Sequence, residues 1–463
     1  MSTITAGPPT FGEANFAEAQ LGDIRRTRRL VSLADALRRH PGGSLPNKLP
    51  SPRNLKALYR LCSRREVTHH TVLAPHRART QRLWVDHDTV LILHDSTELD
   101  YSKRKSLGDL GDIGGPGRHR GYICHNSLAV LPEDGSVLGL FNQILHKRVK
   151  PPKKETKTQL RDRKSRMSRL WLEGVAELPS DRRLVDVCDR GADTFEFLEH
   201  ELGSGRRFVV RSSHSRRIVP RSGSTAKLFL HAHLRAQRAW GKYDLKVRAH
   251  DGMPARKARL SVSAIEVRLI PPRAKKGHHG NEPLAVWAVR VWEPNPPKGQ
   301  KPLEWFLLTN EPLASFADAQ RVVRWYERRW VIEEFHKGMK TGCQIEGLQF
   351  TAEERLQPAI ALLSIVAMTL LQLRDASRQP DADTKPASHL FSRAYIDVLS
   401  GWRYNQVGQE MSVASFFLAL GRLGGHQNRK RDGRPGWLTL WRGWTKLQIM
   451  VEGVGALTRK KCG

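Results

Sequence analysis

Cysteine is scarce in this chain of 463 residues, which contains five: Cys62, Cys124, Cys188, Cys343 and Cys462. No two of them form a C-x-x-C pair, so the sequence suggests neither a cysteine zinc site nor a disulfide framework. The histidine pairs His69-His70 and His278-His279 have no carboxylate or cysteine at ligand spacing. We therefore interpret both pairs as solvated loop histidines rather than as metal ligands.

The sequence also lacks long apolar runs and targeting signals, as we read it. We find no apolar segment of membrane-spanning length, no signal peptide at Met1 and no lipidation motif. No self-similar repeat is present, which argues against a solenoid or a propeller. We expect a soluble cytoplasmic protein with no membrane partner.

Acidic residues are too few to balance the basic ones. Lys and Arg number 78 against 46 Asp and Glu, which leaves a formal net charge of +32. Such an excess repels itself unless a polyanion is bound, and basic residues gain affinity for nucleic acid by releasing counterions from phosphates. A merely solvated basic surface is the alternative.

The N-terminal part reads as a small basic helical unit. Apolar residues recur at helical spacing from Gly22 to Arg39, with Asp23 as the expected cap and a stop at Pro41-Gly42-Gly43. Ser51-Pro52 opens a second helix in the order of cap followed by proline. Each predicted helix carries a cluster of arginines: Arg25, Arg26, Arg28 and Arg29 on the first, and Arg60, Arg64 and Arg65 on the second.

The centre of the chain predicts a mixed α/β core. Short apolar runs bounded by turn residues predict strands at 89–101, 127–131, 138–144, 182–193 and 206–213, with a helix from Thr194. Residues 216–312 read as almost wholly β, like an insertion into this core. Helices are expected at 315–343 and 353–374, a linker at 379–388, and a helical unit from there to the C-terminus.

Two aspartates stand where predicted strands end. Asp95 follows TVLILH and Asp189 follows LVDVC, so both carboxylates would emerge at strand ends of one sheet. An aspartate at a strand end is usually a turn residue, which is the alternative for each of them taken singly. Other nearby acids compete for the same role: Asp186 and Asp193 with Asp189, and Glu98 and Asp100 with Asp95.

The segment RWYERRWVIEEFHKGMK, residues 324–340, is more specific. On a continuous helix, five of its residues fall within roughly 80° of one another: Tyr326, Arg329, Glu333, Lys337 and Lys340. The apolar Ile332, Phe335 and Met339 would face the sheet. An exposed charged helix face is the alternative, but one acid among basic residues and a tyrosine suits a metal-held phosphodiester. Glu334 would point about 100° away from the stripe.

Three motifs together resemble those of one family. HDSTELDY around Asp95, VCDRGAD around Asp189 and the spacing Tyr326-x2-Arg329-x3-Glu333-x6-Lys340 look like the signature of the DDE transposases of the insertion-sequence-four family, in its Tn-five-like branch. FAEAQLGDIRRTRRL, FVVRSSH, PPKGQKPLEWFLLTNEP and LGRLGG followed by LWRGW also look familial. The resemblance covers nearly the whole chain.

The resemblance implies an α/β fold with a ribonuclease H-like catalytic core. A helical domain that binds transposon ends would occupy residues 1–72, the core 73–376 with its β insertion at about 216–312, and a helical dimerisation domain 377–463. Asp95, Asp189 and Glu333 would be the catalytic, metal-binding triad. They would hold two Mg²⁺ ions, with Mn²⁺ able to substitute, and need no nucleotide cofactor. Nicking, hairpin formation, hairpin opening and strand transfer would share this site, and a homodimer would synapse two ends and join them to target DNA.

The resemblance also implies a set of DNA contacts. Tyr326, Arg329, Lys337 and Lys340 would grip phosphates beside the cut. Trp305 would stack on a flipped base, although Leu303, Trp305 and Leu307 share one strand face that could simply be core. Arg211 matches a basic position near the active site. Arg25, Arg26 and Arg29 match end-binding positions, with no base assigned.

Two other functions stay open: a DNA-binding relic that recognises ends without cutting them, and a structure-selective nuclease of the same fold. The basic segments 108–121 and 146–166 are expected to be flexible until DNA orders them, with a solvated loop as the alternative for the second.

Overall fold

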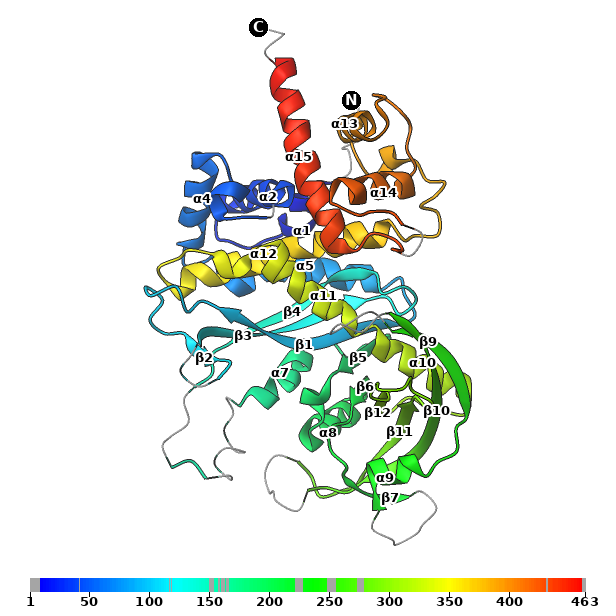
Figure 1. Cartoon of the computed structure of the whole chain (residues 1–463). Helices are drawn as coiled ribbons and strands as arrows, with labels where there is room; N and C mark the ends of the chain where they lie inside the picture. Colours follow the sequence, from blue (N-terminus) through cyan, green and yellow to red (C-terminus); the bar gives the residue numbers. More distant parts are fainter. Residues whose placement is uncertain are drawn as a thin grey trace, which may run out of the picture.

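A single mixed β-sheet runs through the centre of the molecule, with helices on both of its faces (Figure 1). The computed structural model describes residues 9–40, 42–115, 117, 119–149, 154–156, 159, 163, 166–220, 228–247, 255–272, 279–429 and 432–459. Among these, the strand order is β2-β3-β1-β5-β6-β12-β11-β10-β7-β8, with β4 paired to β3 and β9 paired to β10.

The first half of the sheet is built from six strands. They are β1 (Val90–Asp100), β2 (Gly111–Ile113), β3 (His119–Val130), β4 (Val137–His146), β5 (Leu184–Cys188) and β6 (Arg207–Arg211). β1 is antiparallel to β3 and parallel to β5, and β5 is parallel to β6. Every residue of β5 is buried, as expected of a parallel strand covered on both faces. Part of the segment 108–121, expected to be flexible, forms β2 on the edge of β3.

The second half of the sheet is the predicted β segment. It contains β7 (Arg217–Pro220), β8 (Leu228–Phe229), the short helix α9 (Leu230–Arg235), β9 (Gly241–Val247), β10 (Arg256–Leu269), β11 (Leu284–Trp292) and β12 (Glu304–Thr309). Because β12 pairs with β6, these strands continue the core sheet instead of forming a separate one. Most of the basic loop 273–279 lies outside the described residues.

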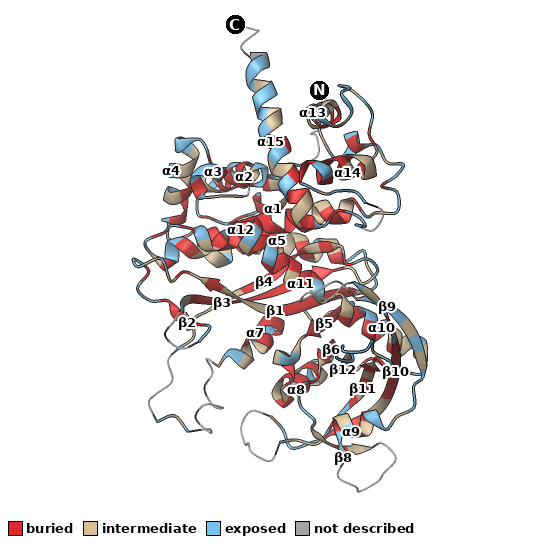
Figure 2. Cartoon of the chain, viewed as in Figure 1, coloured by how far each residue is buried: buried red, intermediate tan, exposed pale blue. Residues whose placement is uncertain are grey.

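Two apolar layers sandwich the sheet, and alternate residues of each strand enter one or the other. Leu91 and Leu93 of β1 and Val187 of β5 pack on the side of α5 and α12, whereas Ile92 and Cys188 pack on the opposite side. This alternation is the two-residue period of a strand. Figure 2 shows the buried residues following the sheet and the helix layer next to it, with exposure concentrated on outer helices and loops.

The N-terminal head consists of α1 (Phe11–Phe16), α2 (Ile24–Arg39), α3 (Leu45–Lys48) and α4 (Pro52–Cys62), followed by α5 (His69–Trp84). The Asp23 side chain accepts the Arg25 N–H, which confirms the predicted cap of α2. Ser51 precedes α4 but makes no side-chain cap bond. His69 and His70 lie in the first turn of α5, so the loop position expected for them is wrong; His69 is hydrogen-bonded to Gln143 at 3.0 Å.

The helix expected over 315–343 is interrupted twice. Ser315 and Asp318 form a capping box at the start of α10 (Phe316–Glu327), but a turn at Arg328-Arg329 separates it from α11 (Trp330–Lys337). A π-helical turn, Gly338–Gly342, then follows α11. The polar stripe predicted for one helix is therefore distributed over two helices, the turn between them and a π turn.

The long helix α12 (Glu353–Ala376) corrects the expectation that no apolar segment could span a membrane. By length and composition it could, but 83% of its most apolar window is buried inside the molecule. It packs against α5 and β4 at the centre of the fold. Burial of this kind identifies α12 as a core helix.

The C-terminal unit contains α13 (Arg393–Tyr404), α14 (Val413–Leu423) and α15 (Trp437–Arg459), and the far end of α15 projects from the body in Figure 1. The segment expected as a polar linker, 379–388, is instead packed onto this unit. Ala382 and Ala387 are buried, and the Val413 N–H donates to the Lys385 carbonyl at 2.8 Å.

Candidate active site and DNA-binding groove

Asp95 lies on β1, Asp189 directly follows the neighbouring parallel strand β5, and both are on the same face of the sheet. The parallel register of β1 and β5 ends with the pair His94 and Cys188, so the two aspartates are the next residues on each strand. Both follow the parity of Leu91, Leu93 and Val187, which places them on the side of α5 and α12. Asp95 does not end its strand, as the sequence suggested, because β1 continues against β3 to Asp100.

Arg329 joins the third acid to the first. Its Nη1 lies 2.8 Å from Asp95 Oδ2, and its Nη2 forms an ion pair with Glu333 Oε1. Arg329 lies in the turn between α10 and α11, and Glu333 follows it one helical turn later. The three side chains are largely shielded, with exposed fractions of 16% for Arg329, 15% for Asp95 and 28% for Glu333. One cation therefore bridges two of the three predicted carboxylates.

Mutual charge effects show that the carboxylates share one environment. Burial raises the pKa of Asp95 to about 6; Arg329 opposes this shift, and the charges of Asp189 and Glu333 add to it. Burial also raises the pKa of Asp189, while a hydrogen bond from the Gly191 N–H and the charges of Arg329 and Arg211 act in the opposite direction. Clustered carboxylates with raised pKa values are typical of functional sites.

The carboxylates suit a hard cation, but they are not gathered around one point. Among the described residues, no three His, Cys, Asp or Glu side chains stand close enough together to hold a metal ion. Arg329 occupies the space between Asp95 and Glu333. Carboxylate oxygens are ligands that Mg²⁺ and Mn²⁺ prefer, so the donor set fits such an ion once the guanidinium moves aside.

The other residues of the predicted stripe have partners of their own. Tyr326 is buried at 9% exposure and lies near enough to Arg329 to raise the pKa of the guanidinium, although burial of Arg329 alone would lower it. Lys337 stands over the ring of Trp330. Lys340 Nζ donates to the Glu98 carbonyl at 2.9 Å and pairs with Glu346 at 3.2 Å.

Arg211 and Trp305 lie on the adjacent strands β6 and β12. Arg211 ends β6 opposite Leu307 of β12, and its charge opposes the rise that burial causes in the pKa of Asp189. Trp305 is half-buried and packs with the apolar layer on the same side of the sheet. Its indole Nε1 is buried without a hydrogen-bond partner, which is costly for a donor in a core. Trp305 therefore packs in the apolar layer and also has an indole N–H that makes no hydrogen bond.

The competing acids have structural partners. Asp186 points to the opposite side of the sheet, fully buried, and binds His94 at 2.8 Å and Arg206 at 2.7 Å. The Asp193 carboxylate accepts the backbone N–H groups of Ser213 at 2.6 Å and His214 at 2.9 Å. Glu98 accepts the Gly114 N–H at 2.7 Å, and Asp100 accepts the Ser102 N–H at 2.8 Å. Strand parity, read from the sequence, could have separated Asp186 from Asp189.

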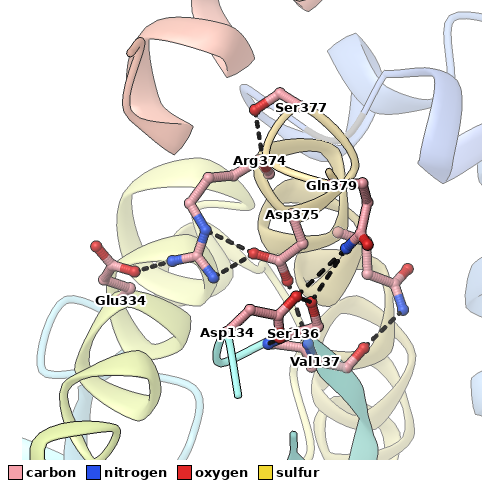
Figure 3. A network of polar contacts seen from close by, with 9 residues as sticks. Asp134, Ser136, Val137, Glu334, Arg374, Asp375, Ser377 and Gln379 are labelled. Atoms are coloured by element: carbon pink, nitrogen blue, oxygen red, sulfur yellow. Dashed lines mark hydrogen bonds and ion pairs between the residues drawn. The ribbon is translucent and has the colours of Figure 1, made fainter. Parts of the chain in front are cut away.

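Glu334 is directed away from this site. It is 9% exposed and forms an ion pair with Arg374, near the end of α12 (Figure 3). Sequence reasoning did not identify Arg374, because its partner is distant along the chain. A charged residue at the end of the apolar run of α12 was the only signal available.

A groove lined by six arginines lies between α2 and α4 of the head. Its lining comprises Arg25, Arg26, Arg29, Arg53, Arg60 and Arg64 together with Ala57 and Leu61. Arg25 pairs with Asp23 at 3.0 Å and Arg26 with Glu66 at 2.9 Å. The three predicted end-binding arginines thus lie in one groove with arginines of the second helix, a geometry suited to a polyanionic backbone.

A protein-family model described as transposase DNA-binding matches residues 9–67, the region from just before α1 to just before α5. The matched region contains all six arginines of the groove. The N-terminal head is therefore similar to the DNA-binding domain of transposases, which identifies DNA as a partner and supports a transposase.

Proposed function

We propose that the chain is a DDE transposase of the insertion-sequence-four family that cuts and joins DNA at transposon ends with divalent metal ions. The proposal rests chiefly on one observation. Asp95 and Asp189 stand side by side at the end of a parallel strand pair, and Arg329 ties Glu333 to the first of them. This constellation lies in a chain whose head matches a transposase DNA-binding family.

The fold supports the finer assignment in several ways. A mixed sheet carries two acids, a helix carries the third, and a β segment precedes that helix, as expected of a ribonuclease H-like core with an insertion. The projecting part of α15 exposes Ile449 at 63%, Val454 at 48% and Leu457 at 69%. These apolar side chains support the proposal that the C-terminal unit joins two copies in the DNA synapse.

Asp95, Asp189 and Glu333 would hold up to two Mg²⁺ or Mn²⁺ ions, which would activate a water or a 3′-hydroxyl and stabilise the leaving oxygen. The three carboxylates must be ionised for this role, and Asp95, whose pKa is about 6, is mostly ionised at neutral pH. Arg329 would exchange its carboxylate partners for phosphate oxygens beside the cut, which suit its fork of donors. Lys337 and Lys340 would add mobile positive charge, and Trp305 would stack on an unpaired base.

The test is a cleavage and joining assay with the purified full chain. The substrates are labelled duplexes covering the DNA that flanks its own coding sequence, with a supercoiled plasmid as target, and each reaction is run with Mg²⁺ and with EDTA. Asp95→Asn, Asp189→Asn and Glu333→Gln are compared with Glu354→Gln, an exposed acid of α12. Metal-dependent excision and joining should disappear in the three variants and persist in Glu354→Gln.

Each alternative predicts a different result in the same assay. Binding of the end duplex without cleavage by the wild-type chain would identify a DNA-binding relic. Metal-dependent cleavage without joining to the plasmid would identify a nuclease. Unchanged joining by Glu333→Gln would refute the assignment of the third acid.

A further inference from the structure

Arg374 is the centre of a buried polar network at the C-terminal end of α12 (Figure 3). Its side chain is 5% exposed, its Nη1 forms an ion pair with Glu334 of α11, and its Nε donates to Asp375 Oδ1 at 2.7 Å. One guanidinium thus serves two shielded carboxylates, one on α11 and the other on its own helix. Burying charges in this way is costly unless each one is paired, so the network stays intact only with the arginine present.

The network continues from α12 into the β3–β4 hairpin. Asp375 Oδ2 accepts the backbone N–H of Val137, the first residue of β4, at 3.1 Å. In the hairpin turn, Asp134 accepts the Ser136 N–H at 2.8 Å, and the Gln379 amide lies 3.4 Å from Asp134. Burial raises the pKa of Asp375, while Arg374 and the Val137 N–H act to lower it. Helix α11 is thereby connected through Arg374 to a helix and a strand of the rigid core.

Helix α11 needs such an anchor. It has eight residues, a turn precedes it, and a π-helical turn follows it. A helix this short has little stability of its own and takes its orientation from tertiary contacts. A second contact acts two residues after Glu334, where the Asn126 Nδ2 donates to His336 Nε2 at 3.1 Å, and Asn126 is the cross-strand partner of Asp95.

We propose that Arg374 is a positioning residue for the third acid: by holding Glu334, it sets the rotation of α11 that directs Glu333 toward Asp95 and Asp189. Consecutive residues of an α-helix point about 100° apart, so fixing the direction of Glu334 also fixes that of Glu333. Among the described residues, Arg374 makes no contact with Asp95, Asp189 or Glu333, so it acts only through its neighbours. The proposal rests on the proposed function, because it assigns Glu333 to the reacting site.

The planar guanidinium is specifically suited to this task. It binds Glu334 and Asp375 with separate nitrogens in fixed directions, whereas a lysine ammonium would supply charge without that geometry. Arg374→Lys therefore keeps the charge of the network and removes its directional part. Arg374→Met removes both and keeps most of the apolar stem. Arg355→Met, which changes an exposed arginine of α12, is the matched surface control.

The experiment measures four properties of the full chain and each variant: the melting temperature, the Kd for the end duplex, the Kd for Mn²⁺ without DNA, and the single-turnover cleavage rate with DNA and metal saturating. For Arg374→Lys we expect an unchanged Kd for the duplex, weaker Mn²⁺ binding and a cleavage rate lower by about 10- to 100-fold, since small misplacement of a catalytic group has effects of that size. Arg374→Met should be slower still, and Arg355→Met should match the wild type.

The outcomes separate the proposal from its foundation. Arg374→Lys and a folded Arg374→Met that cleave at the wild-type rate would overturn the positioning role. A second result would also overturn the positioning role: a cleavage rate that falls only in proportion to the unfolded fraction, together with an unchanged Mn²⁺ affinity of the folded Arg374→Lys. The network would then be purely structural. If the wild-type chain itself binds no Mn²⁺ and cuts no DNA, the proposed function fails instead.

Discussion

Replacing Arg329 with glutamine should make the DNA-free protein bind Mn²⁺ more tightly. In the structure this guanidinium lies 2.8 Å from Asp95 and is also paired with Glu333, so it occupies the place proposed above for a metal ion. A metal ion must first displace it. Arg329→Gln removes that competition while keeping a polar side chain in the turn between α10 and α11.

The size of the effect follows from the two ion pairs. Hydrogen bonds to charged groups contribute about 1.5 to 3 kcal/mol each, and all three side chains are less than a third exposed. Part of the energy of these two ion pairs is recovered when a metal displaces the guanidinium, because water then hydrates it. The repulsion among the carboxylates that Arg329 offsets reduces the difference further. A net gain of about 1.5 to 3 kcal/mol remains, which corresponds to roughly 10- to 100-fold tighter binding.

Isothermal titration calorimetry with Mn²⁺ measures this change directly. The pH should be about 8, because losing Arg329 removes an effect that lowers the pKa of Asp95, and a proton on Asp95 would compete with the metal. Arg328→Gln is the matched control, since Arg328 donates to the Pro132 carbonyl at 2.9 Å and not to the acids. Equal Mn²⁺ affinity in wild type and Arg329→Gln, with binding lost in Asp95→Asn, would refute the competition.

Three further predictions concern charge, stability and DNA binding. Asp95→Asn should raise the melting temperature at pH 8 but not near pH 4. Folding raises the pKa of Asp95 from 3.8 to about 6, so the free energy of unfolding of the wild type falls as the pH rises through that window, by at most about 3 kcal/mol. Calorimetric melting of both proteins at the two pH values checks the sign. Trp305→Phe should leave the free energy of unfolding in urea unchanged or higher, because it keeps the ring in the apolar layer and removes a buried N–H without a partner; a clear loss of stability would contradict this. Arg60→Gln should weaken end binding and reduce the slope of log Kd against log salt by about one, whereas Arg434→Gln, outside the groove, should leave the slope unchanged.

Local signals predicted the elements of this fold well. The apolar run of β5, the alternation in β11 and the Asp23 cap of α2 all operate within a few residues, so they can be read along the chain. The same holds for the buried helix α12, although its composition alone also satisfies the requirements of a membrane span. Only the helices and strands packed around it distinguish the two environments.

Interruptions of regular structure were harder to predict. The stripe from Tyr326 to Lys340 presupposed one helix, yet a turn at Arg328-Arg329 and the π turn Gly338–Gly342 divide it. Neither interruption contains a proline. α10 contacts β5, β6 and β10 whereas α11 contacts β1, so the two helices pack against different strands of the sheet. The packed segment 379–388 was likewise read as a linker because its composition is polar.

The sequence by itself determined the chemistry of this protein: its excess of basic charge, the arginines of the head, and the motif spacings around Asp95, Asp189 and Glu333. These are properties of residue type and separation along the chain. Only the tertiary structure decided which acids meet, since the register between β1 and β5 aligns Asp95 with Asp189, two residues that are far apart along the chain. It also decided that Arg329 lies between two carboxylates and that Arg374 holds Glu334, because ion pairs between distant residues form only when folding brings their backbones together.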